Sequence, residues 1–494
     1  MSNNVRVRFA PSPTGMLHIG GLRTALYNYL FARHHGGSFI LRIEDTDQNR
    51  YVEGAEDDIR NSLKWAGMMY DEGPDAPGEF GPYRQSERSE LYKKYAQQLI
   101  DQDHAYYAFD TTEEIEQMRE RLQKSGNPSP KYDSITRMSM KNSLTLPKDE
   151  VERRLAAGDE YVVRLKVPRR ETIKFTDIIR GVVSFNSAGL DDQVLIKSDG
   201  LPTYHLANVV DDHTMNISHV IRGEEWLSSA PKHILLYEYL GWEPPQMAHL
   251  PLIMSPAGGK LSKRNAEELG IPVNVRDYIK GNYEPEALVN FLAFLGWSPG
   301  DDREILTMEQ LINEFDLQRV SKAGAVFNIQ KLVWYNEHYM RNRTTESLVE
   351  SLKSDLSDAG ITSPGDAYLA KVVELMKDRV SNVSELLPLG RYYFEAPTSY
   401  DEKSVAKAWK GDSIELVGEY KNAIQATDNF SAANLKSILS SIVESRGLGF
   451  GKLMLPVRLA VTGMGFGPDL FETLELLGKN ETVARIDAAL QNLG

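Results

Sequence analysis

The strand-like stretch Val5-Arg-Val-Arg-Phe9 and the loop Ala10-Pro-Ser-Pro-Thr-Gly-Met-Leu-His18-Ile-Gly20 that follows it decide the fold of the N-terminal part. Apolar residues alternate with arginines over 5–9, which predicts a β-strand. Prolines and a glycine then exclude regular structure, and from His18 onward apolar residues recur on one helical face. A Gly36-Gly37 helix end and the apolar run 38–45 predict a second strand. This order of elements predicts two parallel strands joined by a right-handed crossover.

The loop that enters the predicted helix has the composition of a phosphate site. A helix that starts directly after a Pro/Gly-rich loop directs backbone N–H groups and the positive end of its dipole at one place. Gly20 has no Cβ, so a purine or a ribose can approach the backbone closely, and His18 can donate a hydrogen bond to a phosphate oxygen. A tight turn with an ordinary helix N-cap would explain the same residues without any ligand.

A second motif, Lys260-Leu-Ser-Lys263-Arg264, follows the glycine pair Gly258-Gly259. Flexible glycines and two lysines suit a mobile loop that closes on polyphosphate, because an ammonium group is a point charge that can follow moving oxygens. A solvated basic loop is the simpler explanation when this motif is taken alone. Its occurrence in one α/β chain with the His18 loop favours nucleotide binding. The same stretch fails the P-loop pattern, because Met254 and Leu261 replace the required glycine and hydroxyl residue.

Composition narrows the class of protein. The chain has 494 residues, enough for about three domains, with 41% hydrophobic and 26% charged residues, as in ordinary globular proteins. The absence of Cys excludes disulfides, Cys-ligated zinc and a thiol nucleophile. A net charge of −14 excludes indiscriminate coating of nucleic acid, although local basic patches can still bind one. No secretory signal or membrane-spanning apolar run is evident, so we expect a cytoplasmic protein without membrane contact.

Periodicity divides the remainder of the chain. The polar segment 105–190 contains helix-like and strand-like patterns, and we interpret it as an insertion. Strand and helix patterns resume over 192–242, which predicts a return to the α/β core. Helices dominate from Glu284, and after about Ala325 strand alternation is almost absent. The last third is therefore predicted to be all-helical.

At this point the sequence resembles a known family. His18-Ile-Gly-Gly21 resembles the HIGH signature, and residues 260–264 resemble the KMSKS signature, of class I aminoacyl-tRNA synthetases. The match continues through RFAPSPTG, RIEDTD, GPYRQSER, SDGLPTYHLANVVDDH and VIRGEEWLSS, in the order found in bacterial-type glutamyl-tRNA synthetases. Gly21 and Arg264 depart from the two signatures. Some members hold zinc with Cys and His in the insertion, but this chain has HAYYAF there, so we expect no zinc.

The resemblance implies an α/β fold with a particular division into domains. A Rossmann-like catalytic domain would occupy 1–104 and 191–264, and an α+β insertion at 105–190 would contact the tRNA acceptor end. A helical domain that contacts the tRNA stem would span 265–325, and an all-helical anticodon-binding region would span 326–494. The implied activity is that of a monomeric glutamate–tRNA ligase with no DNA partner. It would convert glutamate and ATP, which arrives with Mg²⁺, to glutamyl-adenylate and pass the glutamyl group to the 3′ end of tRNA-Glu.

The resemblance also assigns site residues by position. For glutamate, Arg8 and Arg222 would clamp the side-chain carboxylate, with Tyr204 and Asn208 completing the pocket. Glu44 would take the ammonium group, helped by Ser12 and the backbone at Ala10. The residues implied for ATP are His18, Gly20, Glu225, Trp226, Leu252, Ile253, Lys260 and Lys263. His18 and Lys263 would be the catalytic groups that stabilise charge on the phosphates, and no protein metal ligand or enzyme nucleophile is implied.

The chemistry of glutamate agrees with this assignment. A dicarboxylate with an ammonium group needs two cations and one anion around it, and Arg meets a carboxylate in bidentate fashion. Glutamine would turn an amide NH₂ toward the guanidinium donors, and sites that depend on such pairing reject mismatches by roughly 10⁴–10⁵. Three alternatives stay open: a glutaminyl-tRNA synthetase, a small nucleotidyltransferase and a non-catalytic tRNA-binding paralogue. The sequence also leaves open whether tRNA-Gln is charged.

Overall fold

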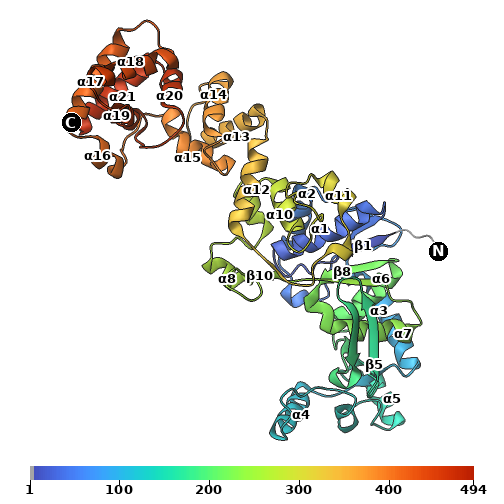
Figure 1. The fold of residues 1–494 in the computed structure, drawn as a ribbon. Coiled ribbons are helices and arrows are strands. Elements are labelled where there is room, and N and C mark those ends of the chain that lie inside the picture. The colour runs from blue at the N-terminus through green and yellow to red at the C-terminus, as the bar shows by residue number, and fades with distance from the viewer. Residues whose placement is uncertain (1–4, 494) are drawn as a thin grey trace. The chain divides into compact units, whose positions relative to one another are not determined.

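The computed structural model describes residues 5–493, which form two compact units. Met1–Ile279 together with Leu288–Ile329 form what we call the N-terminal unit, and Lys280–Ala287 together with Gln330–Gly494 form the helical unit. Strands occur in the N-terminal unit, whereas the orange and red part of the chain in Figure 1 shows helices joined by loops and no strand arrow. No helix within residues 5–493 is long and apolar enough to span a lipid bilayer.

The predicted strand–loop–helix–strand order at the N-terminus is confirmed. Strand β1 (Arg6–Phe9) pairs in parallel with β2 (Ser38–Leu41), and helix α1 (Ile19–His34) connects them. The apolar alternation of β1 places Val7 and Phe9 in the core, and Leu22, Ala25 and Leu26 of α1 are fully buried. The loop between β1 and α1 is thereby held at the carboxyl end of β1, where open α/β sheets bind ligands.

A four-stranded sheet with the order β6-β5-β9-β8 carries the next part of the site. Its strands are β5 (Thr172–Asp177), β6 (Gly181–Asn186), β8 (His219–Gly223) and β9 (Gln246–Leu250). Strands β8 and β9 are parallel, with Arg222 opposite His249, and the end of β5 joins β9 through Asp177 and Met247. The carboxyl ends of β8 and β9 therefore lie side by side, and β5 ends next to the first residues of β9.

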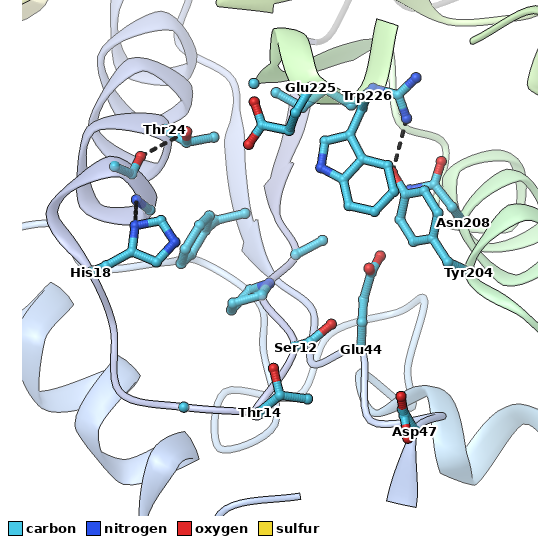
Figure 2. Close-up of a pocket in the computed structure, with 18 of the residues that line it drawn as sticks. Ser12, Thr14, His18, Thr24, Glu44, Asp47, Tyr204, Asn208, Glu225 and Trp226 are labelled. Atoms are coloured by element: carbon cyan, nitrogen blue, oxygen red, sulfur yellow. Dashed lines mark hydrogen bonds between the residues drawn. The ribbon is translucent and has the colours of Figure 1, made fainter. Parts of the chain in front are cut away.

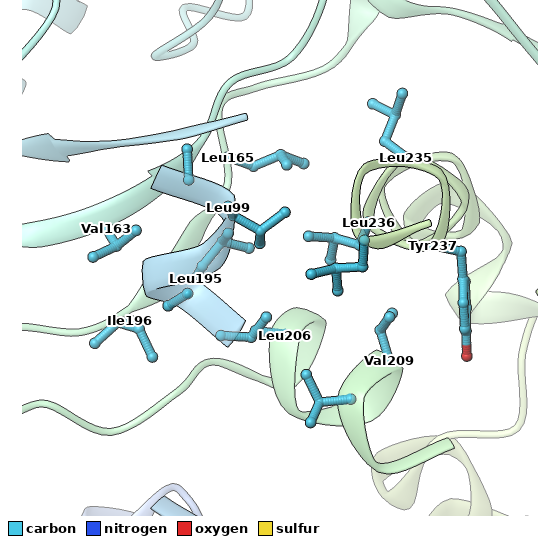
Figure 3. Close-up of a cluster of buried hydrophobic side chains, with 14 of the residues drawn as sticks. Leu99, Val163, Leu165, Leu195, Ile196, Leu206, Val209, Leu235, Leu236 and Tyr237 are labelled. Carbon is cyan, nitrogen blue, oxygen red and sulfur yellow. The ribbon is translucent and has the colours of Figure 1, made fainter. Parts of the chain in front are cut away.

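A three-stranded sheet joins β3 (Ala105–Ala108), β4 (Val162–Leu165) and β7 (Val194–Ile196). Strand β7 was expected in the α/β core, but it pairs with β4 of the predicted insertion, and β5 of that insertion pairs with core strand β9. Alternation along the chain reveals a strand but does not reveal its hydrogen-bond partner. Figure 3 shows the core that strands β4 and β7 share with three of the helices of this unit. Its labelled residues are Leu99, Val163, Leu165, Leu195, Ile196, Leu206, Val209, Leu235, Leu236 and Tyr237.

Shorter elements complete the N-terminal unit. The helices are α2 (Ala55–Trp65), α3 (Ser89–Asp101), α4 (Thr112–Lys124), α5 (Lys148–Ala157), α6 (Tyr204–Thr214), α7 (Ala230–Leu240), α8 (Lys263–Glu268), α9 (Val275–Lys280), α10 (Pro285–Ala293) and α11 (Met308–Glu314). Strands β10 (Ile253–Met254) and β11 (Ala325–Val326) pair in parallel. Helices α9 and α10 cross the boundary between the two units along the chain.

The helical unit confirms the prediction of an all-helical last third for the described residues. It contains α12 (Ile329–Arg341), α13 (Thr345–Asp358), α14 (Asp366–Met376), α15 (Leu386–Gly390), α16 (Glu402–Ala408), α17 (Asp412–Ala426), α18 (Ala432–Ser445), α19 (Gly451–Thr462), α20 (Leu470–Leu477) and α21 (Lys479–Leu493). One apolar cluster joins α12 to α15, and a second joins α17 to α21. Leu, Val and Ile dominate both clusters, as expected for amphipathic helices packed through one face.

Candidate active site

A single cleft of about 1150 Å³ in the N-terminal unit brings the predicted site residues together. Its walls come from β1, the start of α1, the loop after β2, the start of α6, the end of β8 and the loops after β9 (Figure 2). It is lined by each of the residues expected to bind glutamate or ATP: Arg8, Ala10, Ser12, His18, Gly20, Glu44, Tyr204, Asn208, Arg222, Glu225, Trp226, Leu252, Ile253, Lys260 and Lys263. Its size exceeds the roughly 300–1000 Å³ typical of a pocket for one small ligand.

His18 occupies the N-cap position of α1 and is oriented by the helix backbone. Its Nδ1 accepts a hydrogen bond from the Gly21 N–H at 2.9 Å. In the neutral ring the proton therefore lies on Nε2, which leaves one N–H donor for the cleft. A Cβ on Gly20 would lie 3.1 Å from Nδ1, and one on Gly21 would lie 2.8 Å from Leu17 Cδ1. The nearest group to the missing Cβ of Gly20 is the His18 ring, and the role of Gly20 in making room for a nucleotide stays a prediction.

The loop with the two lysines is a tight turn that also lines the cleft. Gly258 and Gly259 have φ of +94° and +73°, a region that favours glycine, and the Ser255 N–H donates to the Gly259 carbonyl at 2.9 Å. Lys260 and Lys263 are exposed, and no described carboxylate lies within 4.0 Å of either ammonium group. Their charges are consequently free to meet an anion in the cleft.

Behind the cleft lies a network of buried charges centred on Arg42, whose side chain is 0% exposed. Arg8 donates to both carboxylate oxygens of Asp212, at 2.9 and 3.1 Å. Arg42 donates to Asp212 Oδ1 at 2.7 Å and to Glu44 Oε1 at 3.1 Å. Asn208 lies between the two guanidinium groups, and its amide oxygen accepts from both at 3.2 Å when it faces them. The network fixes the position of Glu44 at the wall of the cleft.

The surrounding charges set the protonation of these carboxyl groups. Burial raises the pKa of Glu44, and Arg42 and Arg8 oppose the rise. Burial also acts to raise the pKa of Asp212, but its ion pairs with Arg8 and Arg42 outweigh burial and hold it below its ordinary value. Asp212 is therefore a permanent counter-ion for the two arginines, whereas Glu44 presents a carboxylate whose charge is less fully compensated.

Arg222 is held in a different way, because the side chains to which it donates are neutral. It donates to Tyr204 Oη at 2.9 Å, to His249 Nε2 at 3.1 Å and to His233 Nδ1 at 3.2 Å. Its Nη2 is buried without a partner, and no described carboxylate lies within 4.0 Å of its guanidinium group. The ring of Tyr204 packs against Trp226 with centroids 4.1 Å apart, which Figure 2 shows beside Glu44. A buried cation with an unused donor is a ready site for an anionic group.

Several residues that shape the site were not predicted from the sequence, namely Arg42, Asp177, Asp211, Asp212, His233 and His249. Arg42 opens the block RIEDTD, and Asp211-Asp212 stand just before the last residue of the block that contains Tyr204, so their place in charged motifs is a signal that was available. His249 and Asp177 belong to no such block. Their involvement depends on the pairing of β8 with β9 and of β5 with β9.

Comparisons with known proteins identify the family of the chain. Residues 4–334 match the family model described as tRNA synthetases class I (E and Q), catalytic domain, and residues 344–490 match an anticodon binding domain. The chain is 51% identical over 508 residues to the glutamate–tRNA ligase of Cytophaga hutchinsonii, covering 100% of this chain and 98% of the relative. It is 50% identical over 505 residues to that of Bacteroides fragilis, with 99% of each chain covered.

Solved structures lead to the same family. The crystal structure of a glutamate tRNA ligase from Elizabethkingia meningosepticum in complex with its amino acid superimposes with a TM-score of 0.94 at 46% identity, covering 100% of each chain. The glutamate–tRNA synthetase of Elizabethkingia anophelis gives 0.92 at 45% identity, covering 99% of this chain and 100% of the other. The chain belongs to the glutamate–tRNA ligases, a family of class I aminoacyl-tRNA synthetases.

Proposed function

We propose that this chain activates glutamate with ATP and transfers the glutamyl group to the 3′ end of tRNA-Glu. The observation that carries the proposal is Arg222, a buried cation with an unused donor and no carboxylate partner. It lines the same cleft as Glu44, the His18 loop and the two lysines. Arg222 would bind the side-chain carboxylate of glutamate, and Glu44 would bind its ammonium group, helped by Ser12 and the Ala10 backbone.

The reaction needs no covalent attachment to the enzyme. The α-carboxylate of glutamate attacks the α-phosphorus of ATP, and pyrophosphate leaves with its bonding electrons. A ribose hydroxyl at the 3′ end of tRNA then attacks the carbonyl carbon of the adenylate, and AMP leaves. Nε2–H of His18 and the ammonium groups of Lys260 and Lys263 would stabilise charge that develops on the phosphate oxygens. Gly20, Glu225, Trp226, Leu252 and Ile253 would hold the rest of ATP.

Mg²⁺ is expected to arrive with ATP. Residues 5–493 contain no group of three or more His, Asp or Glu side chains placed to hold a metal ion, so the protein offers no cage of its own. Mg²⁺ commonly binds through substrate phosphates and waters, and no step above depends on a protein ligand for it. We also propose that zinc is not required, since the segment HAYYAF has no Cys; elemental analysis that found near-unit zinc would contradict this.

Substitution of Lys263 tests the catalytic assignment. Lys263→Ala should lower the rate of adenylate formation by about 10²–10³-fold while changing the KM for glutamate little, because the ammonium acts mainly on transition-state charge. The control is Lys64→Ala on α2, which removes an exposed lysine that does not line the cleft. Rapid-quench measurement of adenylate with tRNA-Glu present is the readout. A normal rate of adenylate formation in the Lys263 variant would refute the catalytic role of Lys263.

The choice between glutamate and glutamine distinguishes the two activities covered by the matching family model. Aminoacylation of tRNA-Glu should proceed with glutamate and be at least about 10⁴-fold slower with glutamine. A chain that preferred glutamine would be a glutaminyl-tRNA synthetase, and one that charged neither would be a non-catalytic paralogue. Parallel assays with tRNA-Gln settle whether that tRNA is also glutamylated.

We further propose that the helical unit reads the anticodon. Its match to an anticodon binding domain supports this, and RNA sequence is usually read through unstacked loop bases. Transfer of a non-cognate anticodon into tRNA-Glu should lower kcat/KM by about tenfold or more, whereas a helical unit without this role would leave charging unchanged. Contacts of 105–190 with the acceptor end and of 265–325 with the stem, a monomeric state and a cytoplasmic location remain predictions from the sequence.

A further inference from the structure

The two arginines predicted to clamp the substrate carboxylate are held by opposite kinds of partner. Arg8 is paired with both oxygens of Asp212, so its charge is already compensated. Arg222 is held by Tyr204 and two histidines, and its Nη2 has no partner. The register of β8 and β9 places Arg222 directly opposite His249, so this contact is built into the sheet.

The hydrogen bonds determine the tautomer of His249. Arginine can only donate, so His249 Nε2 must be the acceptor, and its proton must lie on Nδ1. Nδ1 lies 2.6 Å from Asp177 Oδ2, and both side chains are 0% exposed. Asp177 is itself fixed, because its Oδ1 accepts from the backbone N–H groups of Ile179 at 3.0 Å and Arg180 at 2.8 Å. The carboxylate of Asp177 therefore orients the His249 ring, although it does not itself contact Arg222.

A second chain of hydrogen bonds connects Arg222 through His233 of α7 to His205. His233 Nδ1 accepts from Arg222, so the proton of His233 lies on Nε2, which is 3.1 Å from His205 Nδ1. His233 is 1% exposed. Burial and the charge of Arg222 lower the pKa of His233 and of His249, and at His249 the bond to Asp177 opposes this shift without reversing it. Both rings are therefore neutral acceptors at neutral pH.

We propose that Asp177 and His205 are positioning residues, which fix the tautomers of His249 and His233 so that neutral acceptors hold Arg222 and its charge stays available to the substrate. This inference rests on the proposed function, in which Arg222 binds the side-chain carboxylate of glutamate. A carboxylate in the place of either histidine would hold Arg222 as well, but it would compete with the substrate for the same charge. The two rings therefore contribute to discrimination between glutamate and glutamine.

The substitution Asp177→Asn tests the hydrogen bond by which Asp177 fixes the tautomer of His249. The amide oxygen of the substituted side chain can keep the bonds from Ile179 and Arg180, but its NH₂ group then faces both Nδ1 and the backbone N–H of His249. The ring must shift its proton to Nε2, where it would meet the N–H of Arg222. The KM for glutamate should rise by about tenfold or more, while kcat at saturating glutamate stays within about threefold. An unchanged KM would overturn the proposal.

A matched pair at position 233 separates charge from shape. His233→Asn keeps a neutral oxygen near the position of Nδ1, and His233→Asp places a carboxylate there with nearly the same volume. We expect the Asn variant to keep the KM for glutamate within about threefold, and the Asp variant to raise it by about tenfold or more. The ratio of kcat/KM for glutamate over glutamine should fall in the Asp variant by a similar factor. Equal values in the two variants would overturn the proposal even if Asp177→Asn failed to fold.

Asp192→Asn is the control, because it makes the same change at a buried carboxylate that binds Tyr106 and Arg137 away from the cleft. It should leave the KM for glutamate unchanged. All assays use the full chain with tRNA-Glu, ATP and Mg²⁺. Wild-type protein that failed to charge glutamate would refute the proposed function itself. Wild-type activity combined with an unaltered KM in the Asp177→Asn and His233→Asp variants would refute only this inference.

Discussion

The N-terminal unit buries charged side chains, whereas the helical unit almost excludes them from its interior. Arg8, Arg42, Glu44, Asp211 and Asp212 are each at most 7% exposed in the N-terminal unit. Among the described residues of the helical unit, the buried charged side chains are Arg458 and Arg485. Its interior is otherwise built mainly from Leu, Val, Ile and aromatic rings.

The difference follows from what each unit is proposed to bind. A small charged substrate can be recognised away from water only by charges that are themselves removed from water, and these need partners to offset their desolvation. An RNA loop is read at a surface, where side chains stay hydrated and need no buried counter-ion. Buried charge therefore marks a preorganised pocket, and an apolar interior marks a scaffold.

The largest expected effect comes from removing the buried cation that has no carboxylate partner. Arg222→Ala should cost roughly 3–5 kcal/mol in kcat/KM for glutamate, because the substrate carboxylate would lose its charge-assisted bonds in a desolvated site. The fold should survive, since no described carboxylate is left unpaired. Steady-state aminoacylation and a thermal melt provide the two readouts. A loss of less than tenfold would show that Arg222 is not the carboxylate site.

A stability measurement tests the network behind the cleft. Asp212→Asn should reduce the free energy of unfolding by about 3 kcal/mol, because Arg8 and Arg42 would keep their buried charges without this counter-ion. Denaturant unfolding of the full chain measures the loss of stability, and hydrogen exchange shows in which of the two units it occurs. Destabilisation confined to the helical unit would contradict the assignment.

The two units should also differ in their response to acid. Burial lowers the pKa of His205 and of His219 to about 4, whereas the unfolded chain titrates them near 6.5. The unfolded state then binds more protons below pH 6.5, so the stability conferred by these neutral rings is lost as pH falls from 6.5 toward 4. At pH 5.5 the loss should be roughly 2.5 kcal/mol for the two rings together.

His338 is the single histidine of the helical unit, so that unit should change much less over the same range. Hydrogen exchange at pH 7.5 and 5.5 measures both units in one sample. His219→Gln removes one titrating ring and should reduce the loss in the N-terminal unit by about half of the amount assigned to these two rings. Equal acid sensitivity in the two units would contradict the role of the buried histidines.

The smallest effect is expected from a second Asp→Asn substitution, at an exposed ion pair in the helical unit. Asp487 pairs with Lys421 at 2.7 Å, but its side chain is 45% exposed. Asp487→Asn should therefore change the free energy of unfolding by less than about 1 kcal/mol. Comparison with Asp212→Asn in the same denaturant series isolates burial as the variable. A loss as large as that of Asp212→Asn would show that exposure does not separate the two ion pairs.

The sequence by itself determined much of this protein. The alternation over 5–9, the apolar run 38–45, the loop before His18 and the helical periodicity after Ala325 predicted elements that the structure contains. Motif blocks identified the residues that line the cleft. These features are readable because each depends on neighbours along the chain, through side-chain periodicity and turn chemistry.

Only the tertiary structure decided which of these residues work together. Arg8 and Asp212 are 204 positions apart, and their ion pair joins β1 to α6. The chain from Asp177 through His249 to Arg222 exists because β5, β9 and β8 are neighbours in one sheet. Strand β7 likewise paired with β4 although it was expected in the core. The packing of the whole unit selects the hydrogen-bond partners across a sheet, and the local sequence pattern does not determine them.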